Sequence, residues 1–193
     1  NRGGVIWHTQ GSGKTELSYY NVKILTDYYA TKGVVAKFYF IVDRLDLMQQ
    51  AADEFRARGL NVVEIGTRAE FMKNIQSTSE DTTTGGLVMN VVNIQKFDQE
   101  AVAKEPDYNV SIQRIYFIDE VHRDYSAEGT FLSLLFNSDR KAIRFGLTGT
   151  PLIGKVSTKN LFGNYIHKYY YNQSIADGYT LRLIREGIKT EYR

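Results

Sequence analysis

The chain has 193 residues, of which 42% are hydrophobic and 24% are charged. A chain of this length buries roughly 70% of its unfolded surface, which excludes general intrinsic disorder. The absence of cysteine excludes a disulfide scaffold and a thiolate metal site, and it fits a reducing cytosol. The net charge of +2 is too even to indicate a nucleic-acid partner. No apolar run approaches the roughly 20 residues of a membrane-spanning helix, so no membrane partner is expected.

Short β-branched or aromatic runs alternate with helical patterns along the chain, which favours an α/β fold with a parallel sheet and crossover helices. Strands are predicted at residues 4–7, 34–42, 61–65, 87–92, 115–118 and 142–147. Helices are predicted at residues 14–31, from 45 to near 59, and at 70–75. Residues 77–86 are predicted to form a surface loop and residues 99–109 a polar connection; beyond Gly163 the pattern weakens and no final element is predicted.

Tyrosine is frequent, with 14 copies. In the first predicted helix, Tyr20 and Tyr28 share spacings of three and four with Leu17 and Ile24, as expected for a helix that packs on one side. We expect the tyrosines at 19–20, 28–29 and 169–171 to pack on a sheet. Stacking on nucleic-acid bases is the open alternative.

The strongest motif is H-T-Q-G-S-G-K-T at residues 8–15, between the first predicted strand and helix. A glycine-bearing loop that leads into a helix N-terminus presents backbone N–H groups to an anion. Lys14 can reach β- and γ-phosphates, and the Thr15 hydroxyl can bind Mg²⁺. His8 stands where the usual spacing rule has glycine, so the strict pattern is not met.

The second motif is Asp119-Glu120-Val121-His122, directly after the buried strand at 115–118. Carboxylates at the carboxyl end of a parallel strand lie where α/β sheets bind ligands. Asp119 can hold Mg²⁺ through water, and Glu120 can deprotonate an attacking water. The third motif, Gly146-Leu147-Thr148-Gly149-Thr150-Pro151, ends the next strand, and by itself it is typical of an ordinary turn.

These three segments resemble, in order and spacing, motifs I, II and III of superfamily 2 helicases and translocases. The resemblance is greater still to the motor (R) subunit of type I restriction–modification enzymes. It rests also on V-D-R-L-D-L-M-Q-Q at 42–50, N-I-Q-K-F at 93–97 and S-I-A-D-G-Y-T-L-R-L at 174–183. It covers essentially the whole chain as one RecA-like P-loop NTPase domain.

The resemblance implies a prokaryotic, cytoplasmic motor that couples ATP hydrolysis to double-stranded DNA translocation before cleavage. Its cofactors would be ATP and Mg²⁺, and its partners duplex DNA and the modification and specificity subunits of the restriction complex. Candidate nucleotide-binding residues are Thr9, Gln10, Gly11, Ser12, Gly13, Lys14 and Thr15, of which Thr15 would also serve the metal together with Asp119. Candidate catalytic residues are Lys14, Asp119, Glu120 and His122. Thr148 and Thr150, with His122, would couple hydrolysis to movement, and Arg44, Asn93 and Lys96 are candidates for DNA-backbone contact.

Val121 stands where the family commonly has alanine. No segment resembles motifs IV to VI or the nuclease domain of the family. We therefore expect residues 1–193 to be the first motor domain of a larger subunit, nearly inactive alone, with residues from about 172 leading toward a second RecA-like domain. Three alternatives stay open: another superfamily 2 DNA or RNA helicase, a nucleotide-regulated binding module that does not cycle, and, less favoured, a small-molecule kinase.

Overall fold

The computed structural model describes residues 2–77, 86–95, 97, 111–121, 131–150 and 161–181. Its strands are β1 (Gly3–His8), β2 (Val35–Val42), β3 (Asn61–Ile65), β4 (Val88–Asn93), β5 (Ile112–Ile118), β6 (Ile143–Thr148) and β7 (Tyr165–Tyr169). Its helices are α1 (Lys14–Ala30), α2 (Leu45–Ala57), α3 (Arg68–Gln76), α4 (Phe131–Ser138) and α6 (Tyr171–Ala176).

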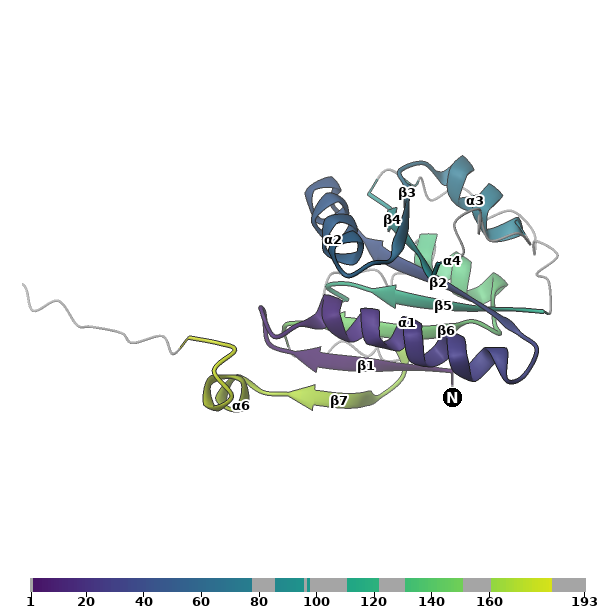
Figure 1. Cartoon of the computed structure of the whole chain (residues 1–193). Coiled ribbons are helices and arrows are strands. Elements are labelled where there is room, and N and C mark those ends of the chain that lie inside the picture. Colours follow the sequence, from purple (N-terminus) through teal and green to yellow (C-terminus); the bar gives the residue numbers. More distant parts are fainter. Residues whose placement is uncertain are drawn as a thin grey trace, which may run out of the picture.

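The seven strands form one sheet in the order β3-β4-β2-β5-β6-β1-β7, and every neighbouring pair is parallel. The carboxyl ends of the strands therefore share one edge, toward which the arrowheads of Figure 1 point. In open parallel sheets this is the edge at which ligands bind. The predicted α/β class with a parallel sheet and helices on both faces is confirmed.

Two apolar layers cover the faces of the sheet, because successive side chains of a strand point to opposite faces. On β2, Phe38 and Phe40 join the layer beneath α1 and α2, whereas Tyr39 and Ile41 join the layer beneath α3 and α4. The segment from Ala36 to Val42 is buried throughout, as a central strand covered on both faces requires. The edge formed by the carboxyl ends of the strands thus rests on an apolar core on each face of the sheet.

Helix α1 forms where it was predicted, but the expected packing of its tyrosines is only partly right. Ser18 and Val22 form its buried face, whereas Tyr20, Ile24 and Tyr28 are exposed. The helix carries apolar residues on both sides, so the apolar spacing indicates a helix without showing which face is buried. Tyr170 and Tyr171 are also partly exposed.

Three elements were not predicted: α4, β7 and α6. Strand β7 pairs with β1 at the edge of the sheet, and its middle residues Ile166, His167 and Lys168 are exposed. An edge strand with so little buried surface has no alternating apolar pattern that a sequence could reveal. Most of the predicted loop at 77–86 and all of the connection at 99–109 lie outside the described residues. In the part of the chain that the structure describes, no helix is long and apolar enough to cross a membrane.

Candidate nucleotide site

The glycine-bearing loop lies between the end of β1 and the start of α1. Gly11 and Gly13 have φ angles of 77° and 83°, a left-handed conformation that favours glycine. Gly13 is the N-cap of α1 and makes no side-chain cap, so no N-cap side chain occupies the first amides of the helix, which are the groups that bind anions in such loops. The backbone N–H of Ser12 donates to the Thr9 carbonyl at 3.2 Å, which closes the loop into a compact turn.

Lys14 is the first residue of α1, and its amine lies close to Gly149, which follows β6. A Cβ atom built on Gly149, after β6, would lie 3.6 Å from Lys14 Nζ and 3.7 Å from the backbone nitrogen of Gln10. A methyl group at 149 would therefore be in ordinary van der Waals contact with the lysine amine and the loop backbone. The positive charge of Lys14 also acts on Asp119, whose pKa it lowers against the stronger effect of burial.

Asp119 and Glu120 follow β5 at the same edge. The Asp119 N–H donates to the Ile41 carbonyl at 3.0 Å, and the Val121 N–H donates to the Leu147 carbonyl at 3.0 Å, so the acidic pair is held between β2 and β6. Glu120 has a φ angle of 54°, which costs a non-glycine residue on the order of 1–2 kcal/mol. Its N–H donates to Asp119 Oδ1 at 3.0 Å. The two carboxylates are therefore fixed by the backbone of three strands.

The negative charges of Asp119 and Glu120 repel each other, which makes Asp119 harder to ionise. Burial, followed by the adjacent Glu120 carboxylate, raises the pKa of Asp119 to about 6, although Lys14 and the Glu120 N–H act in the opposite direction. A carboxyl group in this state gains from any added positive charge, because a nearby cation favours the ionised form. A divalent cation bound beside Asp119 would therefore stabilise the ionised carboxylate.

A cavity of about 780 Å³ joins these groups. Its lining includes eight of the predicted site residues, namely Gln10, Gly11, Ser12, Gly13, Lys14, Thr15, Asp119 and Glu120. It also includes residues from α2 and from the β7–α6 region to which the sequence analysis gave no role: Gln50, Glu54, Arg58, Tyr169, Asp177 and Tyr179. Gln50, Asp177 and Tyr179 lie in segments that carry the family resemblance, but those segments were not assigned to the nucleotide, because only the fold brings them to the loop.

Thr9 lies in a neighbouring cavity instead, with its Oγ1 buried and without a hydrogen-bond partner among the described residues.

Thr148 is fully buried, and its hydroxyl donates to the Thr150 carbonyl at 2.9 Å while accepting from the Thr150 N–H at 3.2 Å. These two threonines form a closed turn beside Lys14. His122, the third residue of the predicted coupling set, lies outside the described residues.

His8 takes the place of the expected glycine and connects β1 to the edge strand. Its Nε2 lies 2.8 Å from Nδ1 of His167 on β7, and the side chain is 8% exposed. Burial lowers the pKa of His8 to about 4, with smaller contributions from His167 and Lys14. His8 is therefore neutral near pH 7, and it adds no charge to the phosphate loop.

Of the predicted DNA-contact residues, the two that the structure describes, Arg44 and Asn93, do not line this cavity. Arg44, ahead of α2, pairs with Asp46 at 2.7 Å on the exposed surface. Asn93 is buried, and its side-chain oxygen accepts the Gln95 N–H at 3.0 Å, so its amide stabilises a turn. Lys96 lies outside the described residues.

The residues present fit a nucleotide with Mg²⁺. The loop supplies backbone N–H donors and one ammonium group, which suit phosphate oxygens. The Thr15 hydroxyl and the Asp119 carboxylate are hard oxygen ligands, which Mg²⁺ prefers and usually supplements with water and substrate phosphates. Among the described residues no group of three histidines or acidic residues gathers into an all-protein metal site.

Comparisons with known proteins show the family to which the chain belongs. A family model described as SWI2/SNF2 ATPase matches residues 1–192. The chain is 31% identical over 197 residues to the type I restriction enzyme SsaAORF53P endonuclease subunit of Staphylococcus saprophyticus, covering 97% of this chain and 20% of that protein. It is 27% identical over 206 residues to the putative type I restriction enzyme MjaVIIIP endonuclease subunit of Methanocaldococcus jannaschii, with the same coverage of 97% and 20%. The chain thus spans about a fifth of the length of these curated relatives.

Two solved structures share the fold. A nuclease-deletion mutant of the Type ISP restriction-modification enzyme LlaGI, in complex with a DNA substrate mimic, matches 93% of this chain and 19% of its own with a TM-score of 0.59 at 16% identity. The Hef helicase domain of Pyrococcus furiosus matches 88% of this chain and 35% of its own with a TM-score of 0.56 at 18% identity. The chain therefore has a RecA-like helicase-domain fold, belongs to the SWI2/SNF2 ATPase family, and is homologous over nearly its whole length to endonuclease subunits of type I restriction enzymes.

Proposed function

We propose that this chain is the ATP-binding motor domain of a type I restriction enzyme R subunit. The observation that carries the proposal is one cavity that joins the Lys14 amine, the glycine-bearing loop and the Asp119–Glu120 carboxylates. A cation, a set of backbone donors and two carboxylates at one edge are what phosphoryl transfer requires, because its catalysis is mostly positioning and charge stabilisation.

Each residue has a separate task in this proposal. Residues 11–15 hold the phosphates, with Lys14 Nζ donating to β- and γ-phosphate oxygens. The Thr15 hydroxyl and Asp119 hold Mg²⁺, which supplies charge neutralisation at the phosphates when bound. Glu120 Oε accepts a proton from the water that attacks the γ-phosphorus. His122, Thr148 and Thr150 transmit the nucleotide state to the rest of the motor.

The wider activity is proposed from the relatives. In the intact subunit, ATP hydrolysis would drive translocation of double-stranded DNA before cleavage, in the cytoplasm of a prokaryotic cell. A second RecA-like domain would supply the arginine that stabilises the transferring phosphoryl group, a contribution of about 10³–10⁵ in related hydrolases. The nuclease domain and the modification and specificity subunits would complete the complex. Arg44, Asn93 and Lys96 remain the proposed contacts to the DNA backbone.

The test separates the two carboxylates in the full-length subunit. Glu120→Gln should retain Mg-ATP binding and lose turnover by about 10²–10⁴-fold, because it removes a general base and keeps the shape. Asp119→Ala should weaken the Mg²⁺-dependent part of binding itself. Phosphate release with duplex DNA and equilibrium titration with labelled ATP measure the two effects.

Glu54→Gln is the matched control, because Glu54 also lines the cavity but has no assigned role in the reaction. It should leave turnover within a few-fold of the parent protein. Equal binding defects in Glu120→Gln and Asp119→Ala would contradict the division of tasks. Unchanged turnover in Glu120→Gln would reject the proposed site.

A further inference from the structure

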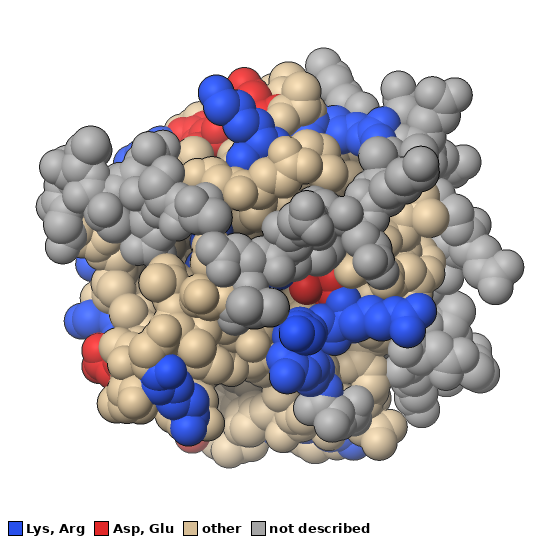
Figure 2. All heavy atoms as spheres, turned by 90° about the vertical axis from the view of Figure 1, so that its right-hand side faces the viewer, with Lys and Arg blue, Asp and Glu red and all other residues tan. Residues whose placement is uncertain are grey.

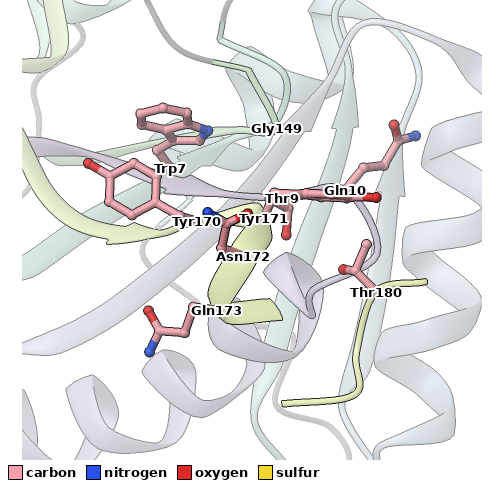
Figure 3. A pocket seen from close by; sticks show the side chains of 9 residues that line it. All are labelled: Trp7, Thr9, Gln10, Gly149, Tyr170, Tyr171, Asn172, Gln173 and Thr180. Atoms are coloured by element: carbon pink, nitrogen blue, oxygen red, sulfur yellow. The ribbon is translucent and has the colours of Figure 1, made fainter. Parts of the chain in front are cut away.

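A second cavity, of about 660 Å³, adjoins the phosphate loop. Figure 3 shows that its side chains come from the end of β1 with the following loop, from Gly149, and from the β7–α6 segment. Trp7, Tyr170 and Asn172 belong to this lining, and Gln10 lines both this cavity and the larger one. A ligand whose phosphates lie on residues 11–15 can therefore extend into the second cavity without leaving the protein surface.

The lining chemistry differs sharply from that of the first cavity. None of the nine described residues that line the second cavity is charged, whereas the first contains Lys14, Asp119 and Glu120. The second cavity suits the neutral part of a nucleotide rather than its phosphates. Its volume lies within the range of about 300–1,000 Å³ that is typical of small-molecule sites.

Aromatic rings supply stacking surfaces in this cavity. Trp7 and Tyr170 pack edge to face with ring centroids 5.0 Å apart, and Tyr170 is 46% exposed. Part of its ring surface is therefore not covered by the protein. Aromatic faces of this kind stack on bases whatever the base identity, because every base has a π-face.

Hydrogen-bonding groups stand beside the rings. Gln10, Asn172 and Gln173 carry side-chain amides, and an amide presents the donor and acceptor pair that matches the amino and ring-nitrogen edge of adenine.

We propose that this second cavity holds the adenine base of the nucleotide, with Trp7 and Tyr170 as the aromatic surface and the neighbouring amides at the base edge. This inference rests on the proposed function, because it requires the phosphates to lie on residues 11–15. It assigns a nucleotide-binding role to the β7–α6 segment, which follows the three motifs in the chain and which the sequence pattern did not predict.

The chain offers an internal reporter, because Trp7 is its only tryptophan. Titration of the 193-residue chain with ATP and Mg²⁺ should change the Trp7 emission. Titration with inorganic tripolyphosphate and Mg²⁺, which has no base, should saturate the phosphate loop and leave the emission unchanged. Isothermal calorimetry should measure the binding of both ligands independently of fluorescence.

Variants then separate the base from the phosphates. Tyr170→Ala should weaken ATP binding by about 5- to 150-fold, the range for one stacked base, and leave tripolyphosphate binding unchanged. Lys14→Ala should weaken the binding of both ATP and tripolyphosphate. Tyr28→Ala, a half-exposed tyrosine near the end of α1, should change neither and serves as the matched control.

The outcomes distinguish the two proposals. ATP that binds without changing Trp7 emission, with an affinity that Tyr170→Ala leaves intact, would overturn the base site while the phosphate site stands. Failure of both ATP and tripolyphosphate to bind the parent chain would overturn the proposed function and this inference together. Because Tyr170 is half-exposed, its removal does not open the core, and circular dichroism confirms that the variant folds.

Discussion

At the start of β5, Arg114 Nε donates to Asp139 Oδ2 at 2.5 Å, with both side chains almost fully buried, whereas the end of the same strand places Asp119 and Glu120 side by side. The first pair joins opposite charges, and Tyr116 adds a hydroxyl that donates to Asp139 at 3.3 Å. The second pair joins like charges on a backbone with a positive φ at Glu120. The two ends of one strand thus hold different charged pairs: a buried ion pair at the start and two partly exposed carboxylates after the end.

The contrast separates an ion pair whose breaking would cost stability from the two carboxylates to which the proposed function assigns the reaction. Figure 2 faces the edge where the strands begin, where Lys and Arg side chains lie among uncharged residues and a few acidic ones. At that edge Gln113 Nε2 donates to the Lys141 carbonyl at 2.9 Å, and the buried ion pair lies beneath. At the opposite edge, strain and a raised pKa persist because the surrounding strands enforce them, as at many functional sites. Variants at one edge should therefore change stability, and variants at the other should change binding and turnover.

Asp139→Ala is the largest expected disruption of the amino edge. It removes the carboxylate that pairs with buried Arg114, and breaking a buried pair from one side costs about 3–5 kcal/mol of folding free energy. Urea unfolding should show this loss. Nucleotide affinity of the folded fraction should stay at the parent value, because the pair lies at the other end of β5.

Asp53→Ala is the matched control for this experiment. Asp53 pairs with Arg56 at 3.2 Å on the exposed surface of α2, where an ion pair is worth about 0–1 kcal/mol. Equal destabilisation by the two variants would show that burial does not set the value of the Arg114–Asp139 pair.

Lys14→Ala should produce the reverse result. Loss of charge-assisted hydrogen bonds to phosphate costs about 1.5–3 kcal/mol, or about 10- to 150-fold in nucleotide affinity. The free energy of unfolding should change little, because the side chain lines an open cavity. Lys23→Ala, on the same helix and exposed, should leave both quantities unchanged. A Lys14→Ala protein that binds ATP as tightly as its parent would show that this lysine does not bind the phosphates, and the assignment of nucleotide binding to this edge of the sheet would fail.

The two edges also differ in how far the sequence alone could predict them. The loop after β1 and the acidic pair after β5 were predicted because each combines a motif with a buried strand that precedes it. No sequence pattern indicated the ion pair between Arg114 and Asp139, because the fold brings together two residues that are 25 positions apart. Likewise His167, Tyr169 and Asp177 reach the site from an exposed edge strand and the segment after it. Their chemistry depends on which strand pairs with β1, and no local pattern encodes that choice.

The pH dependence of stability provides a finer test, because two groups beside Lys14 shift in opposite directions. His8 titrates near 6.5 when unfolded and at about 4 when folded. The unfolded chain therefore binds this proton first, and the contribution of His8 to stability is lost as pH falls from 6.5 to 4. Asp119 titrates near 3.8 when unfolded and at about 6 when folded. The folded chain binds this proton first, so the contribution of Asp119 is lost as pH rises from 3.8 to 6.

These opposing contributions should nearly cancel between pH 4 and 6. His8→Gln should expose the Asp119 effect, so that the free energy of unfolding, relative to the parent, falls as pH rises. Asp119→Asn should expose the His8 effect and give the opposite slope. Each slope should be at most about 1 kcal/mol per pH unit after allowance for solvent screening. Urea titrations across this range measure both, and variants with the same pH profile as the parent would contradict the shifted pKa values.

The smallest effect tests the strain itself. Glu120 has a φ of 54°, a conformation that glycine adopts without the penalty of a Cβ. Glu120→Gly and Glu120→Ala both remove the carboxylate and should abolish turnover equally, but only glycine relieves the strain. The glycine variant should therefore be more stable than the alanine variant by about 0.5–1 kcal/mol, after part of the gain is offset by the greater freedom of glycine in the unfolded chain. Paired urea titrations resolve a difference of this size. Because both variants lose the same side-chain contacts, an alanine variant as stable as the glycine variant would mean that the backbone at Glu120 is relaxed, and the reactive end of β5 would then hold charge without stored strain.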